Sequence, residues 1–173
     1  MVFDTQKLRS VMALIIITIA VISFAGLGSA VVTSSNVTLS DSTPTPGSDV
    51  TVTVTATPDN STAGFSFTHE FNQSVASASI DSTSLDSTII SDANQDGATV
   101  TSGSGSFTAG EQVTITYTIT TEDAAGKSVS ITGDVTNGDT QALPDRSYTV
   151  TAAGDDPDQP ANAGDVTPIT SDN

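Results

Sequence analysis

The most aromatic segment of the chain reads Ala63-Gly64-Phe65-Ser66-Phe67-Thr68-His69-Glu70-Phe71-Asn72-Gln73-Ser74-Val75. It contains three of the six phenylalanines and the single histidine, His69. The residues alternate with a period of two, so the phenylalanines and His69 fall on one face and small or polar residues on the other. This alternation predicts a half-buried β-strand whose aromatic face is covered by other strands.

Similar alternation recurs on both sides of this segment. Valines alternate with threonines over residues 49–56, and the longest clean pattern covers residues 113–120. Turn signals such as Pro44-Thr45-Pro46-Gly47 separate the segments, and no helical periodicity follows residue 30. We therefore predict an all-β protein, an antiparallel β-sandwich of about eight to nine strands. The side chains expected in its core are Val50, Val52, Val54, Phe65, Phe67, Phe71, Val113, Ile115, Tyr117, Ile119, Val129, Ile131, Tyr148 and Val150.

The first thirty residues have the layout of a secretory signal peptide. Lys7 and Arg9 precede an apolar run over residues 11–27, and Gly28-Ser29-Ala30 supplies small residues for cleavage. A retained N-terminal membrane anchor is the alternative, and both place the body outside the cell. The predicted order is a signal or anchor helix at 1–30, a Ser/Thr spacer at 31–35, the sandwich at 36–152 and an acidic flexible tail at 153–173.

The composition is strongly acidic. Four Lys and Arg face twenty Asp and Glu, for a formal net charge of −16. Without a basic patch the chain is unsuited to nucleic acid or to anionic membrane surfaces. This balance is typical of secreted proteins of extreme halophiles, because concentrated salt screens the self-repulsion of such a surface. There is no cysteine, so disulfides and thiolate sites are excluded.

Three stretches of the chain carry a family resemblance. They are a Pro-Gly turn that leads into the valine-alternating strand at 46–54, the segment Gly64-Phe65-Ser66-Phe67, and Gly105-Ser106-Phe107 followed by residues 113–117. In these stretches the chain resembles the cohesin-type domains of the carbohydrate-binding-module superfamily. Asn72-Gln73 departs from the Asp-Pro that is usual at the following turn. The resemblance implies a nine-stranded jelly-roll, or immunoglobulin-like, sandwich that serves as a non-catalytic adhesion or scaffolding module outside cells.

The sequence contains no recognisable catalytic motif, although twenty acidic residues always offer some pair of carboxylates of the kind that glycosidases use. His69 lies in phase with phenylalanines and is expected in the core, and no zinc-protease, nucleophile-elbow or phosphate-loop spacing occurs. Asp92, Asn94 and Asp96, followed by Gly97, copy the first half of a calcium loop. The twelfth position is Gly103 where a bidentate glutamate is needed, so the alternatives are a weak calcium site and an ordinary acidic turn.

Two kinds of surface residue remain. Asn36, Asn60 and Asn72 each begin an Asn-x-Ser/Thr triplet and are candidate N-glycosylation sites of an exported glycoprotein. The outward residues of two strands form rows that make a candidate interaction face, namely Thr51, Thr53, Thr55, Thr114, Thr116 and Thr118.

These observations favour an exported, non-catalytic surface module that contacts another surface protein or further copies of itself. The alternative is a carbohydrate-binding module attached to polysaccharide-degrading machinery. Sugar binding usually needs exposed aromatic rings, yet the chain has no Trp and both tyrosines are in the inward phase. An ordinary solvated sheet face can also be rich in threonine, so the rows alone do not establish a binding face.

Overall fold

The computed structural model describes residues 31–153. The signal or anchor segment and nearly all of the predicted tail lie outside this range. The described part contains ten strands and no helix, and therefore none that could cross a membrane. The strands are β1 (Val32–Leu39), β2 (Asp49–Pro58), β3 (Phe65–Phe71), β4 (Ser77–Thr83), β5 (Ile90–Asn94), β6 (Gly97–Ser102), β7 (Val113–Thr120), β8 (Ser128–Asn137), β9 (Asp139–Ala142) and β10 (Arg146–Thr149).

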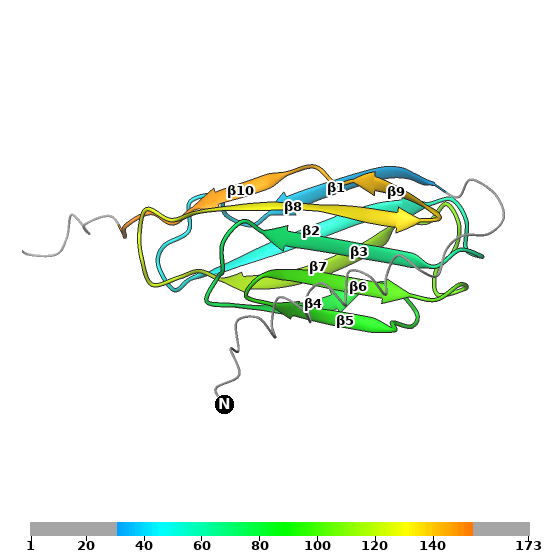
Figure 1. Ribbon diagram of the computed structural model, residues 1–173, viewed down its shortest axis with the longest axis horizontal. Helices are drawn as coiled ribbons and strands as arrows, with labels where there is room; N and C mark the ends of the chain where they lie inside the picture. Colours follow the sequence, from blue (N-terminus) through cyan, green and yellow to red (C-terminus); the bar gives the residue numbers. More distant parts are fainter. Residues whose placement is uncertain (1–30, 154–173) are drawn as a thin grey trace, which may run out of the picture.

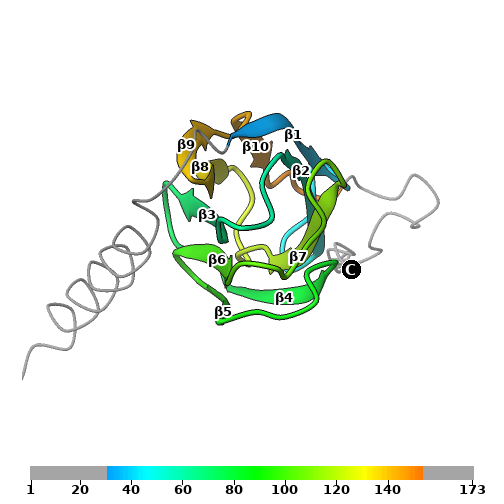
Figure 2. The same ribbon diagram turned by 90° about the vertical axis from the view of Figure 1, so that its right-hand side faces the viewer.

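The strands form two antiparallel sheets that pack face to face (Figures 1 and 2). Sheet A has the order β1-β2-β7-β4. Sheet B has the order β10-β8-β3-β6-β5, with β9 added beside β8. All strand pairs are antiparallel, so the predicted all-β sandwich is confirmed.

The core lies between the inward faces of the two sheets. Sheet A contributes the valines of β2 and the alternate residues of β7, and sheet B contributes the aromatic face of β3. Every side chain that the sequence placed in the core is buried in the structure. Full burial of a large apolar side chain contributes about 1.5–3 kcal/mol, so these alternating strands supply most of the driving force for folding.

Two features of the strands differ from the expectation drawn from the sequence. The spacer expected at residues 31–35 is mostly part of β1, because Val32 is buried and Ser34 pairs with Thr57. β9 was not expected, because all four of its side chains are exposed and its alternation carries no apolar signal.

One lateral side of the sandwich is closed by Arg146. Its Nε donates to the Val37 carbonyl of β1 at 2.7 Å, and its Nη2 lies 3.4 Å from Asn36 Oδ1. The guanidinium thereby joins β10 of sheet B to the free edge of β1 in sheet A. An edge carbonyl that is bonded in this way is not available to a neighbouring chain.

The sandwich is elongated, and its described ends lie far apart. β1 begins at one end of the long axis, and the chain leaves β10 at the other (Figure 1). Successive strands run along this axis.

Candidate interaction faces

The outer face of sheet A is made almost entirely of hydroxyl side chains. We call it the hydroxyl face. Its members alternate with the buried residues of all four strands. They are Ser34, Asn36 and Thr38 on β1, Thr51, Thr53, Thr55 and Thr57 on β2, Thr114, Thr116, Thr118 and Thr120 on β7, and Ser77, Ser79 and Ser82 on β4.

The strand register places the six predicted threonines in three opposed pairs. Thr51 faces Thr118, Thr53 faces Thr116, and Thr55 faces Thr114. The central row extends to both edges of the sheet, through Thr38 on β1 and Ser82 on β4. Opposed β-branched side chains pack against each other and stabilise an antiparallel pair. The two rows that the sequence predicted are therefore one continuous surface.

Two threonine hydroxyls near the margins of this face are bonded to carboxylates, whereas those of the central threonines are not bonded. Thr118 Oγ1 donates to Asp81 at 2.7 Å, and Thr120 Oγ1 donates to Asp49 at 2.8 Å. Both carboxylates lie at the margins. Within residues 31–153, no hydrogen bond is found for the hydroxyls of the central threonines, which are half-exposed and comprise Thr51, Thr53, Thr55, Thr114 and Thr116. Their donors and acceptors remain free for water or a partner.

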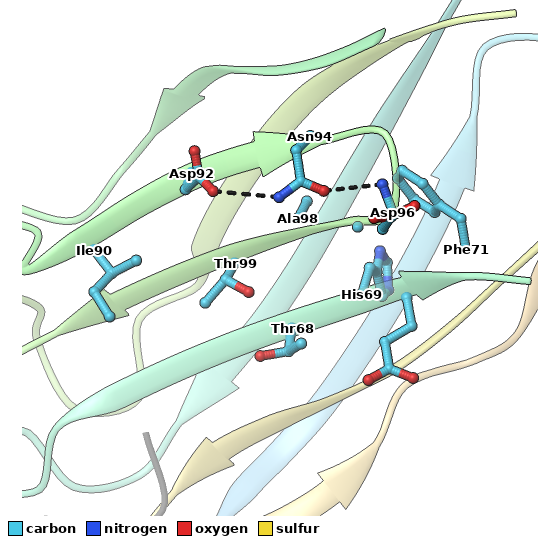
Figure 3. A pocket seen from close by; sticks show the side chains of 11 residues that line it. Thr68, His69, Phe71, Ile90, Asp92, Asn94, Asp96, Ala98 and Thr99 are labelled. Atoms are coloured by element: carbon cyan, nitrogen blue, oxygen red, sulfur yellow. Dashed lines mark hydrogen bonds between the residues drawn. The ribbon is translucent and has the colours of Figure 1, made fainter. Parts of the chain in front are cut away.

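The outer face of sheet B is different, because it is acidic and hollowed. We call it the acidic face. A hollow of about 240 Å³ lies over β6 at Gly97 (Figure 3), bordered by Glu70 on β3 and by Asp92 and Asp96. A side chain at Gly97 would overlap the His69 carbonyl, so the close approach of β3 and β6 requires glycine there. A second hollow of about 400 Å³ lies over β3 and β8 and is lined by Glu70, Asp134 and Asp145.

The predicted half calcium loop is the β5–β6 hairpin. Asp92 and Asn94 lie on the outer face of β5, and Asp96 lies in the turn (Figure 3). Asn94 Nδ2 is 3.5 Å from Asp92 Oδ2, and Asn94 Oδ1 accepts the Asp96 N–H at 2.9 Å. Ser74 Oγ also donates to Asp96. Among residues 31–153, no three His, Cys, Asp or Glu side chains are grouped closely enough to hold a metal ion.

His69 is buried in the core and has one polar partner. Its Nδ1 lies 2.7 Å from the Tyr117 hydroxyl of the opposite sheet, and its ring meets Phe67 edge-on at 4.6 Å. Nε2 is buried with no partner within the described residues. Burial lowers the pKa of His69 from 6.5 to about 3 and raises the pKa of Tyr117. A neutral histidine at 1% exposure cannot act as an acid or base on an external substrate.

The three glycosylation candidates have different surroundings. Asn36 is exposed on the hydroxyl face, opposite Thr55. Asn60 is half-buried, and its Oδ1 accepts hydrogen bonds from the backbone and hydroxyl of Thr62. Asn72 is exposed, and its Oδ1 accepts the Ser130 N–H at 2.8 Å. Asn36 and Asn72 therefore present the more accessible amides.

Sequence reasoning did not identify the acidic face. Its carboxylates come from β3, β8, the β5–β6 hairpin and the segment before β10, and only the topology brings them to one surface. The available signal was the polar alternation of β3, where Thr68 and Glu70 point away from the core.

No protein-family model matches the chain, and a search of curated proteins finds no match. Among solved structures, the chain is similar to the C-terminal domain of the Streptococcus agalactiae antigen I/II polypeptide BspA, with 10% identity over 69% of this chain and 50% of that one, at a TM-score of 0.52. It is also similar to the C-terminal domain of the Streptococcus pyogenes antigen I/II-family protein AspA, with 8% identity over 69% and 53% of the two chains, also at 0.52. The chain thus spans about half the length of these structures.

Cohesin domains are also among the similar structures, as the sequence motifs led us to expect. The third cohesin of ScaC from Acetivibrio cellulolyticus, solved in complex with the ScaB dockerin, is 17% identical over 69% of this chain and 100% of its own, at a TM-score of 0.42. At sequence identities of 8–17%, the similarity to these structures concerns the fold alone. What the chain itself shows is a β-sandwich of two antiparallel sheets.

Proposed function

We propose that this protein is an exported, non-catalytic module of the cell surface that contacts another protein through its hydroxyl face. The observation that carries the proposal is the centre of that face, where opposed threonine pairs are half-exposed and their hydroxyls are not used within the domain. Each free hydroxyl offers one donor and two acceptor positions to a partner. The likeness in fold to the C-terminal domains of two antigen I/II polypeptides supports the proposal.

The electrostatics of the hydroxyl face also favour contact. Its charged neighbours, Asp49 and Asp81, lie at the margins and are bonded to threonines. Within the described residues, Lys127 pairs with Glu122, and Arg146 lies at the edge between β1 and β10. In the described part of the chain, no ammonium group therefore stands at the centre of the face to oppose association.

Sugar binding is the second candidate function. The observation in its favour is the larger hollow of the acidic face, where Thr68, Thr132 and three carboxylates could bond sugar hydroxyls. Tyr117 and Tyr148 are buried, and the large apolar side chains exposed in the described part are Val31 and Ile89. A flat aromatic platform for a sugar ring is thus missing from this part of the chain, which makes protein contact the better-supported function.

The test compares two double variants of equal charge change. Thr53→Lys with Thr116→Lys places two ammonium groups on an opposed pair of the hydroxyl face. Thr68→Lys with Thr99→Lys does the same to an opposed pair on the acidic face. We expect the first variant to be released from the producing cell's envelope into the medium and the second to be retained. Equal retention of both folded variants would remove the hydroxyl face from the function, and tight binding to polysaccharide would favour the second candidate.

Export and modification are proposed from the sequence and can be measured together. We expect the native protein to begin at Val31 and to carry glycan on at least one of Asn36, Asn60 and Asn72. Intact-mass measurement before and after enzymatic deglycosylation gives both answers. A species that retains residues 12–30 would instead favour the membrane anchor.

A further inference from the structure

We propose that the partner of the hydroxyl face is a second copy of this chain, with the two sheets A stacked face to face about a twofold axis. The inference rests on the proposed function of that face and specifies its partner. Three properties of the described surface support it: its hydrogen-bonding chemistry, the distribution of charge over the two faces, and its area.

The chemistry of the hydroxyl face is complementary to itself. A carboxylate face can only accept hydrogen bonds and an ammonium face can only donate them, so neither can pair with its own copy. A threonine hydroxyl does both, and its methyl group adds apolar contact. In a twofold contact the same patch of each copy faces the other. The free hydroxyls of Thr53 and Thr116 could then act either as donors or as acceptors toward the hydroxyls of the second copy.

The charge distribution favours stacking of two hydroxyl faces over stacking of two acidic faces. Glu70, Asp92 and Asp134 all lie on sheet B, and their carboxylates point away from sheet A. Stacking sheet A on sheet A turns both acidic faces outward. With sheets about 10 Å apart, roughly 30 Å separates the two acidic faces. This is about three Debye lengths at 0.1 M salt, so their mutual repulsion is largely screened.

The area of the face predicts a weak dimer. Sheet A has four strands, which average about eight residues in length. At ~4.8 Å between strands and ~3.3 Å per residue, its flat area is roughly 500–600 Å². A standard stable interface buries about 800 Å² on each partner. The dimer should therefore form and dissociate with protein concentration, and it should be favoured by high salt.

The first experiment is sedimentation of the purified full chain across a concentration series at low and high salt. We expect a monomer–dimer equilibrium that shifts toward dimer as salt rises. Thr53→Lys with Thr116→Lys should be monomeric throughout, and Thr68→Lys with Thr99→Lys should dimerise as the unmodified chain does. Association that persists in the first variant would overturn the inference, since it would have to use another surface, such as the apolar N-terminal segment.

Cross-linking gives a second readout that does not introduce charge. The chain contains no cysteine, so Thr116→Cys creates a single reactive position. A short bifunctional maleimide should link two copies of Thr116→Cys and leave Thr99→Cys unlinked. Equal linkage of the two variants, or none in either, would contradict face-to-face stacking.

The two proposals can fail separately. A chain that is monomeric under every condition, yet loses envelope retention in the hydroxyl-face variant, would keep the proposed function and overturn the second copy as partner. Loss of dimer without loss of retention would support this inference and contradict the proposed role of the face in attachment.

Discussion

At the scale of single residues, His69 couples the stability of the sandwich to pH. Its ring lies between Phe67 and Tyr117, and Nε2 has no partner in the described structure. A proton on this ring would be a buried charge without a counter-ion. That cost is the reason why burial lowers its pKa.

We therefore expect His69 to destabilise the protein in mild acid. The unfolded chain binds a proton near pH 6.5, whereas the folded chain does not until about pH 3. The free energy of unfolding is therefore unaffected by His69 above pH 6.5. As the pH falls from 6.5 toward 3, it decreases by about 1.4 kcal/mol per pH unit. His69→Gln should lack this part of the slope. Denaturant unfolding of both proteins between about pH 7 and about pH 4, at constant high salt, measures the difference. Parallel stability curves would show that the histidine is not the source.

Gly133 is the residue where an added methyl group should be least tolerated. It lies opposite His69 on β8, where a Cβ would overlap the Thr68 carbonyl and lie 2.7 Å from His69 Cδ2. We expect Gly133→Ala to lower the free energy of unfolding by about 3 kcal/mol. Gly103→Ala is the control, because a Cβ there meets only Ile89 at 3.8 Å. Equal midpoints in chemical denaturation would contradict the close packing of β3 and β8.

At the scale of strands, alternation predicted those that bury one complete face. The bounds of β7 were predicted correctly and β2 was predicted two residues too short, because each strand places an apolar side chain on every second position. Alternation could not predict β9, whose side chains are all exposed. It could not predict the first half of β1 either, because Val32 is the one buried residue of that strand before Val37. Both are held by backbone pairing to a neighbour, which leaves no trace in hydropathy.

The hydroxyl face was predictable in composition but not in register. The sequence indicates that Thr53 and Thr116 point outward, since each lies between buried residues. That they face each other depends on β2 pairing with β7, two strands separated by four others in the chain. Such distant pairing follows from how the whole sandwich closes, and no local pattern encodes it.

The β5–β6 hairpin permits a test of the calcium alternative. If Asp92, Asn94 and Asp96 hold calcium, the ion should raise the melting temperature at low salt more than magnesium does, because calcium accepts irregular oxygen ligation. Asp92→Asn with Asp96→Asn should remove the difference between the two ions. The measurement is thermal unfolding followed by circular dichroism. An equal effect of both ions in the unmodified chain would assign the gain to screening of the negative charge.

At the scale of the whole molecule, the net charge of −16 should make folding depend on salt. The Debye length grows from about 10 Å at 0.1 M to about 30 Å at 0.01 M salt, so carboxylates on both ends of the sandwich then repel one another. We expect the β-sheet signal of the purified chain to be lost on dialysis to tens of millimolar salt and to return in concentrated salt. Far-ultraviolet circular dichroism follows both steps. Full folding at low salt without calcium would contradict the interpretation as a halophile's protein.

The position of the two described ends has a mechanical consequence. Because β1 starts at one end of the long axis and the chain leaves β10 at the other, a pull between these ends acts parallel to the strands (Figure 1). β1 would then have to slide lengthwise along β2, against a ladder that runs from Val32 to Leu39. All of its rungs would bear the load together, whereas peeling a strand from one end would break them one after another. If the chain is attached at one end and held at the other, the force acts along the strands, which is the direction in which the sandwich resists unfolding best.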